Sequence, residues 1–489
     1  MGMVRPTIRT SILIGIPFIG LSSEHTKMSP LADNLIQQGI LQLNQGRTND
    51  AVQTFQSVLS GDPNQSAAAY YLGLIRYQEP DYAAAKALLK IAAHHDRGNF
   101  QARLYLGYAC YYLNELADAK TEFQRALKLE PKSADVHLAL ALILEKGGDR
   151  SGAGTHSRRA IQLAPDNTEM LNFHVRLLMD AGQFEAARST LQQSLAIDPK
   201  NSRARAAEIL IEIALHNLEA AQSLFANLEA EAADWLGLNM LRANIFLARD
   251  QPEDAIKLLR QMSGDQQDSL SIALMLGKAL IACDAPAEAV AIYRDLLKTV
   301  TGNFELHFDL SRALKAQGKF DESLIELNEA LRIDPSEGNI YYRALVYFAR
   351  GDYAKGAADY EFRWHSSADG YIRRPFQQPA WRPGTDLKGE TVLVWGEQGV
   401  GDQILFGGLL PWLASTTGRC IFECDERLAP AFQRAFPGIE VVGAAAKPDK
   451  RALSPDITMQ IPLASLMAAI PGWPDHFEFA ARYLEPDKK

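Results

Sequence analysis

Apolar and polar positions repeat with a period of 34 residues over more than 300 residues of the chain. One slot of the period holds a small residue every time, at Ala51, Ala85, Ala119, Ala153, Ala187, Ala221, Ala255, Ala289, Ser323 and Ala357. Proline marks the ends of consecutive periods at Pro131, Pro165 and Pro199. Between these marks, apolar residues lie at the spacing of helices that are buried on one side.

Each period predicts two helices that pack against each other as a hairpin. Glycine recurs at one slot, at Gly39, Gly73, Gly107 and Gly277. An aromatic residue recurs sixteen positions later, at Phe55, Phe123 and Tyr293. Small residues allow two helices to approach closely, and the ring fills the space beside them. A proline then ends the second helix. A hairpin of this size cannot bury its apolar face alone, so consecutive hairpins must stack.

The pattern Leu106-Gly107, Ala119, Phe123, Ala126 and Pro131 resembles the tetratricopeptide repeat. In this register nine repeats begin at residue 32 and at every 34th residue after it, and a partial tenth begins at residue 338. The resemblance covers about residues 31–364. It implies a mostly α fold, a right-handed α-solenoid, whose concave groove binds a protein or peptide segment.

The first helices of the second and third repeats are rich in tyrosine. By the same resemblance these side chains line the groove: Tyr70, Tyr71, Tyr77, Tyr105, Tyr108, Tyr111 and Tyr112. Tyrosine combines a large contact area with a polar tip, which suits peptide recognition. The alternative is that several of these rings pack between hairpins. A carboxylate clamp of the chaperone-binding kind is not expected, because Ile36 and Ile40 stand at its positions.

The period stops after Trp364, and the pattern changes. Residues 365–389 contain several prolines and arginines and are predicted to form a connector, which either packs against the last hairpin or faces an anion. Strands and helices then alternate, which predicts a parallel sheet with helices on both faces. The predicted strands are Thr391–Trp395, Cys420–Cys424, Ile439–Val442 and Asp456–Ile461, and the predicted helices are Ile404–Ala414 and Arg427–Phe436.

The segments Tyr360–Trp364, Glu397–Asp402 and Ile461–Leu466 resemble those of bacterial tetratricopeptide-repeat proteins with a glycosyltransferase-like domain. That domain is distantly similar to heptosyltransferases and shares the GT-B type with O-GlcNAc transferase. The resemblance implies a small α/β, Rossmann-like half-domain over residues 390–489.

Heptosyltransferases carry a Gly-Asp pair after the first strand, and its Asp is thought to be the general base. Gly401-Asp402 matches this pair, so the resemblance implies that Asp402 is catalytic. It also implies that Glu397, Gln398, Gly399 and Gly401 bind substrate. The alternative is that Asp402 is the N-cap of a helix that begins at Ile404.

A GT-B enzyme needs a second Rossmann-like half, which holds most of the nucleotide-sugar site. No such half is recognisable before Lys489. We therefore expect a protein-binding repeat array with a half-domain that is inactive alone. The alternative is a glycosyltransferase that uses a nucleotide sugar, with a protein or saccharide acceptor, and whose donor-binding half is missing from this chain. A third, weaker expectation is a purely structural scaffold. No cofactor or metal is expected.

Composition limits the remaining choices. Apolar residues make up 47% of the 489 residues and charged residues 22%, which is ordinary for a globular protein. The net charge of −9 offers no general attraction for nucleic acid. Four cysteines are too few for a disulfide framework and favour a cytoplasmic location.

Residues 1–30 do not follow the repeat pattern. Residues 1–23 have the outline of a signal peptide, with Arg5 and Arg9 before an apolar run that is too short to span a membrane. If residues 1–23 are a signal peptide, the protein is exported and not cytoplasmic. The alternative is that translation starts at Met28.

Overall fold

The computed structural model describes residues 30–474 and 484, apart from 234, 236, 263–268, 336, 366–373, 375, 383, 398, 446 and 447. It divides into two compact units, Met1–Arg249 and Asp250–Lys489, and each is described by itself. The predicted signal segment 1–23, Met28 and Gln398 lie outside the described residues. In the described part of the chain, no helix combines the length and apolar character that crossing a membrane requires.

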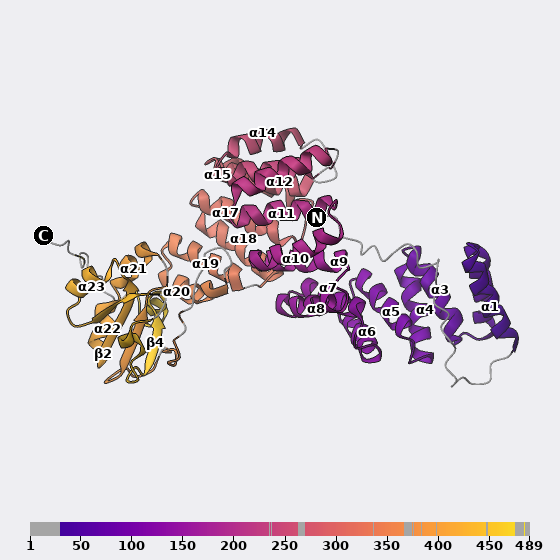
Figure 1. Cartoon of the computed structure of the whole chain (residues 1–489), viewed down its shortest axis with the longest axis horizontal. Coiled ribbons are helices and arrows are strands. Elements are labelled where there is room, and N and C mark those ends of the chain that lie inside the picture. The colour runs from indigo at the N-terminus through magenta and orange to yellow at the C-terminus, as the bar shows by residue number, and fades with distance from the viewer. Residues whose placement is uncertain are drawn as a thin grey trace. The chain divides into compact units, whose positions relative to one another are not determined.

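The first unit consists of helical hairpins joined by short turns (Figure 1). Its helices are α1 Pro30–Asn44, α2 Thr48–Gly61, α3 Ser66–Gln78, α4 Tyr82–His95, α5 Phe100–Tyr112, α6 Leu116–Leu129, α7 Ala134–Lys146, α8 Arg150–Leu163, α9 Thr168–Asp180, α10 Phe184–Ile197, α11 Ser202–Ala214, α12 Leu218–Glu231 and α13 Leu238–Ala248. From α1 to α12, an odd-numbered helix and the next even-numbered helix form one hairpin; we call them its first and second helix. By its place in the 34-residue period, α13 counts as a first helix. Successive first helices from α3 to α11 begin 34 residues apart, as the sequence predicts.

The two helices of a hairpin pack closely around a glycine and an aromatic ring. A Cβ atom on Gly107 would lie 2.6 Å from Cε1 of Phe123, whose side chain is completely buried. Gly39 and Phe55 meet in the same way in the first hairpin. First helices of neighbouring hairpins also contact each other, as α3 contacts α5. The repeated glycine and ring therefore explain why the hairpin geometry repeats.

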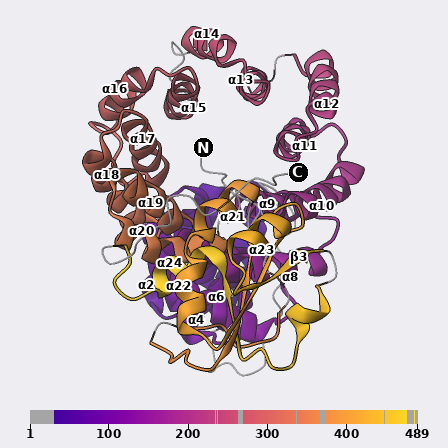
Figure 2. The same cartoon turned by 90° about the vertical axis from the view of Figure 1, so that its left-hand side faces the viewer.

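The second unit continues with hairpins. Its helices are α14 Pro252–Met262, α15 Ser269–Ala282, α16 Pro286–Leu296, α17 Phe304–Ala316, α18 Phe320–Ile333, α19 Glu337–Arg350 and α20 Tyr353–Tyr360, and a 3-10 helix, η1 Glu361–His365, follows. From α15 to α20 the helices pair in the same way, and α14 counts as a second helix by its place in the 34-residue period. Within this unit, α15 and α17 lie on the inner side of the curve of hairpins, with α16 and α18 outside them (Figure 2). The faces of the first helices are thus the inner faces of these hairpins.

A four-stranded sheet follows the hairpins of the second unit. Its strands are β1 Thr391–Trp395, β2 Arg419–Asp425, β3 Glu440–Ala444 and β4 Met459–Pro462. The strand order is β3-β2-β1-β4, and every neighbouring pair is parallel. The predicted parallel sheet is therefore confirmed.

The helices around the sheet differ from the prediction in two ways. The predicted helix Ile404–Ala414 is two helices, α21 Val400–Gly407 and α22 Leu410–Thr416, because Gly407 and Gly408 end the first and Pro411 starts the second. These helices, α23 Ala429–Ala435 and α24 Leu466–Ala469 belong with one face, that of Val392, Val394 and Phe422. In the described residues, the other face is covered by the 3-10 helix η2 Lys450–Leu453 and by Phe376. A further 3-10 helix, η3 Leu463–Ser465, follows β4.

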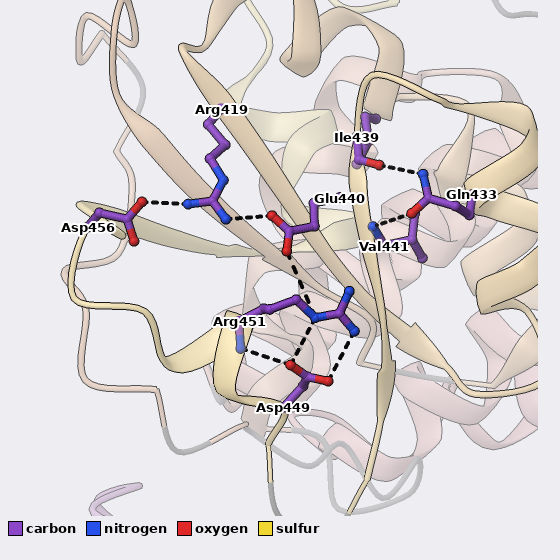
Figure 3. A network of polar contacts seen from close by, with 8 residues as sticks. All are labelled: Arg419, Gln433, Ile439, Glu440, Val441, Asp449, Arg451 and Asp456. Carbon is purple, nitrogen blue, oxygen red and sulfur yellow. Dashed lines mark hydrogen bonds and ion pairs between the residues drawn. The ribbon is translucent and has the colours of Figure 1, made fainter.

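Ion pairs join the strands at their amino ends (Figure 3). Arg419, the first residue of β2, donates to Glu440 of β3 and to Asp456 before β4, each at 2.5 Å. Arg451 pairs with Asp449 at 3.1 Å and lies 3.9 Å from Glu440. These side chains are partly exposed, and they surround strand ends that lie opposite the glycine loop.

Candidate functional site

Four of the seven tyrosines expected in the groove are buried: Tyr70, Tyr71, Tyr105 and Tyr108. Tyr71 stacks on Phe55 with ring centroids 5.5 Å apart, and Tyr108 meets Phe123 edge-on at 5.0 Å. Burial raises the pKa of Tyr105 to about 12 and that of Tyr71 above its usual value. These four rings pack within and between hairpins, which is the alternative that the sequence left open.

The other three tyrosines, Tyr77, Tyr111 and Tyr112, are only partly buried. The Tyr112 ring lies 5.6 Å from Tyr111 and 6.0 Å from Tyr77, measured between centroids. Tyr82 of α4 stacks on Tyr112 at 4.5 Å, and Lys146 Nζ lies 5.0 Å from the Tyr111 ring centroid. We call Tyr77, Tyr82, Tyr111 and Tyr112 the tyrosine cluster. It joins the ends of α3 and α5 to the start of α4.

The second candidate region is the glycine loop after β1. Gly399 and Gly401 are exposed, and Gly399 is the N-cap of α21. Glu397, in contrast, has a side chain only 3% exposed. Both of its oxygens accept from Arg363: Nε donates to Oε2 at 2.7 Å and Nη2 donates to Oε1 at 3.0 Å. Glu397 therefore faces the protein interior and not an open substrate site.

Arg363 lies on η1, directly after the last repeat helix, and its side chain is completely buried. Besides Glu397, it donates to Ser465 Oγ at 2.7 Å and to Glu361 at 3.0 Å. The Trp364 ring centroid lies 4.4 Å from Cζ of the guanidinium. Glu397 also accepts from the backbone N–H of Ala464. Burial raises the pKa of Glu397, and Arg363 opposes that shift.

This network lies where β1 and β4 end. In sheets of this kind, ligands bind outside the carboxyl ends of strands whose connections lead in opposite directions. Here β1 leads to β2 on one side and pairs with β4 on the other. The guanidinium of Arg363 fills part of that position. The pairing of Arg363 with Glu397 was not predicted from the sequence, because no periodicity connects the two residues.

An arginine of the connector likewise pairs with a buried glutamate, at β2. Arg374 donates from Nε and Nη2 to the two oxygens of Glu423, at 2.8 and 2.6 Å, and the Glu423 side chain is completely buried. Asp425 pairs with Arg427, which holds the pKa of Asp425 at about 2. Arg374 therefore packs against the sheet, and its charge is balanced within the chain.

Asp402 lies in the first turn of α21 and is half-buried. The helix begins at Val400, so the alternative in which Asp402 caps a helix from Ile404 is wrong. The helix thus begins one turn earlier than the apolar pattern predicted, within the glycine-rich segment. Burial raises the pKa of Asp402. A carboxylate in this setting is able to accept a proton.

The four cysteines are not activated thiols. Cys110, Cys283, Cys420 and Cys424 are free thiols. Burial raises the pKa of Cys420 and of Cys424 to about 12, which makes both thiols unreactive. Among the residues that the structure describes, no three histidine, cysteine or acidic side chains gather in a way that could hold a metal ion.

Comparison with known proteins places family matches on the hairpins. One tetratricopeptide-repeat family model matches residues 144–211, 178–245 and 280–346, a second matches 107–148, and a third matches 36–94. Protein FlbA of Caulobacter vibrioides is 32% identical over 132 residues, which are 25% of this chain and 22% of FlbA. BBSome complex member BBS4 of Xenopus tropicalis is 27% identical over 129 residues, 26% of this chain and 24% of BBS4. The chain thus spans less than a quarter of either relative.

Among solved structures, a tetratricopeptide repeat protein from Parabacteroides merdae is 15% identical, with a TM-score of 0.41. The match covers 48% of this chain and 93% of that protein. YrrB, described as a TPR protein with an unusual peptide-binding site, is 18% identical with a TM-score of 0.34, over 38% of this chain and 97% of YrrB. The family matches show that the helical hairpins over residues 36–94, 107–245 and 280–346 are tetratricopeptide repeats, as the 34-residue period predicted.

Proposed function

We propose that this chain binds a protein or peptide segment through the face formed by the first helices of its repeats. The tyrosine cluster carries the proposal. Tyr77, Tyr111 and Tyr112 come from neighbouring first helices and stay partly exposed, and the Tyr112 ring contacts those of both Tyr77 and Tyr111. Partly exposed aromatic side chains are enriched in binding hot spots, because on binding they bury a large area at a small cost in side-chain entropy.

A peptide-display selection on the full chain tests this proposal. We expect binders whose affinity falls by about tenfold or more when Tyr111 or Tyr112 is replaced by Ala, the size of effect typical of an aromatic hot spot. Tyr353→Ala is the matched control, because Tyr353 is a 48% exposed tyrosine on a second helix, α20. The proposal fails if no peptide is selected, or if Tyr353→Ala weakens binding as much as Tyr111→Ala.

We also propose that the α/β part is a glycosyltransferase-like half-domain of GT-B type, inactive alone. The strand order β3-β2-β1-β4 and the glycine loop after β1 support this assignment. Of the residues proposed to bind substrate, Glu397 is committed to Arg363, whereas Gly399 and Gly401 are exposed. The alternative is an active enzyme with Asp402 as general base, which its raised pKa favours.

Incubation of the full chain with a panel of nucleotide sugars separates these alternatives. Under the first, no sugar is transferred or released, and peptide binding survives Asp402→Asn. Under the second, turnover occurs and Asp402→Asn abolishes it. Asp386→Asn, at an exposed position of the connector, is the control that leaves turnover unchanged.

A further inference from the structure

First helices of the second unit bring two cations together around one carboxylate. Lys278 comes from α15, and Asp309 and Arg312 come from α17. Asp309 Oδ2 lies 3.2 Å from Lys278 Nζ, and Asp309 Oδ1 lies 3.3 Å from Arg312 Nη1. The Asp309 side chain is 4% exposed, whereas those of Lys278 and Arg312 are 46% and 42% exposed. A buried carboxylate thus holds two cations at the surface.

A third cation, Lys315, lies one turn after Arg312 on α17. Its Nζ lies 5.2 Å from the centroid of the Tyr342 ring on α19, and the charge of Arg312 also acts on the Tyr342 side chain. In the part of the chain that the structure describes, no carboxylate pairs with Lys315. Burial, and after it the charge of Arg312, lowers the pKa of Lys315. Lys315 is therefore a half-buried cation that no carboxylate of the described residues neutralises.

Aromatic side chains adjoin these cations. Phe308 lies 4.9 Å from Tyr342 and 5.4 Å from Phe304, measured between ring centroids, and all three are partly exposed. Lys278, Arg312 and Lys315 with Asp309 sum to a charge of +2, and the group stays positive when Glu305, one turn before Asp309, is counted. A chain whose net charge is −9 therefore has a positive, partly aromatic patch on first helices of the second unit, and α15 and α17 are the inner helices of their hairpins (Figure 2).

We propose that the inner face of α15, α17 and α19 binds an acidic peptide segment of another protein. Its carboxylates would meet Lys278, Arg312 and Lys315, and an apolar side chain would pack on Phe308. Charge complementarity of this kind sets partner choice and speeds association. The inference rests on the proposed function of the repeats and adds the chemical class of the partner.

The test uses the full chain and a fluorescein-labelled synthetic peptide that alternates glutamate and phenylalanine. Its counterpart has glutamine in place of glutamate. Fluorescence anisotropy should show binding of the acidic peptide at least about tenfold tighter than binding of the amide peptide, and the difference should shrink as salt screens the charges. Equal affinity for the two peptides would overturn the proposal.

Two substitutions test whether the peptide binds to this face. Lys315→Met and Arg312→Met should each weaken binding of the acidic peptide by about five- to tenfold, the range for partly desolvated charged contacts. Lys257→Met is the control, because Lys257 is an exposed lysine on the second helix α14. Circular dichroism confirms that each variant is folded; removal of the charge of Lys315 should not destabilise the hairpin.

Two failures are distinguishable. If display selection yields peptides that bind at the tyrosine cluster, but the acidic peptide does not bind or is insensitive to Lys315→Met, this inference is wrong and the proposed function stands. If no peptide binds anywhere on the full chain, both are wrong.

Discussion

The repeat hairpins and the sheet-containing part of the second unit are held together in different ways. In a hairpin, the decisive contact joins residues close in sequence, as Gly107 meets Phe123. At the junction of the last hairpin and the sheet, Arg363 pairs with Glu397 and with Ser465, 34 and 102 residues away. The Gly107–Phe123 contact is apolar, and equivalent contacts occur in other repeats. The contacts of Arg363 are buried and charged, and they follow no repeating pattern. Only the first kind produces a periodic signal in a sequence.

The largest expected effect comes from breaking the junction. Arg363→Ala leaves the Glu397 carboxylate buried without its partner, so we expect a loss of about 3–5 kcal/mol of stability, as for other broken buried pairs. Urea unfolding followed by the fluorescence of Trp364 and Trp395, whose rings lie 5.7 Å apart, measures the loss.

The control for this prediction is Arg332→Ala. Arg332 pairs with Glu329, but their side chains are 71% and 48% exposed. Its loss should cost less than about 1 kcal/mol. Similar effects of the two substitutions would remove the distinction between buried and exposed pairs on which the comparison depends.

The repeat side of the comparison is tested at two glycines. Gly107→Ala places a Cβ atom 2.6 Å from the Phe123 ring and should destabilise the chain by about 1–3 kcal/mol. Gly154→Ala, inside α8, meets no atom within 4 Å and should stabilise it by about 0.5–1 kcal/mol, because alanine favours the helix. Thermal unfolding compares the two, and a shift of the same sign in both contradicts the packing argument.

We expect a change of pH to alter the stability of the repeats that contain α7, α8 and α9. His137 Nδ1 lies 3.0 Å from His156 Nδ1, and His174 Nδ1 lies 2.6 Å from Ser157 Oγ. Burial lowers the pKa of all three histidines. As the pH falls below about 6.5, the usual pKa of histidine, the unfolded chain therefore binds more protons than the folded chain. The free energy of unfolding then decreases as the pH decreases. More than about one pH unit above that pKa the histidines are neutral in both states and contribute almost nothing to the slope.

Hydrogen exchange, corrected for its intrinsic pH dependence, measures this effect locally. The opening free energy of α7–α9 should fall between about pH 6.5 and 5.5, by at most about 1.4 kcal/mol per pH unit for each extra proton that the unfolded state binds. His156→Gln should reduce the slope. An unchanged slope in that variant would rule out the histidine pair as its cause.

The smallest effect is expected at the amino ends of the strands (Figure 3). Arg419 bridges Glu440 and Asp456, but its side chain is 40% exposed. Arg419→Met should therefore cost less than about 1 kcal/mol, and the cost should diminish in high salt. A cost as large as that of Arg363→Ala, measured in the same urea experiment, would show that burial does not separate the two sites.

The sequence predicted the parts of the fold that depend on local pattern. The 34-residue period predicted the hairpins, and the apolar run Thr391–Trp395 has the bounds of β1. The sequence pattern did not distinguish buried from exposed tyrosines, because helical spacing alone does not show which side of a helix a neighbouring hairpin covers. Tyr71, for example, is covered by Phe55 of the preceding hairpin. The pairing of Arg363 with Glu397 was missed for the same reason, since only the tertiary fold brings η1 to the end of β1.

The candidate site was predicted less completely than the fold. The sequence identified Glu397 and Asp402 by resemblance, and the structure places the first in a buried ion pair and the second in a half-buried helix turn. The positive patch at Lys278, Arg312 and Lys315 was not predicted, because its members come from two hairpins and share no motif.

Hydrogen exchange of the full chain, with and without a peptide obtained by display selection, tests the central claim most directly. The account predicts that the bound peptide slows exchange in first helices, at the end of α5 or along α15 and α17, and leaves the second helices α6, α16 and α18 unchanged. Protection confined to residues 391–470, or to second helices, would contradict it.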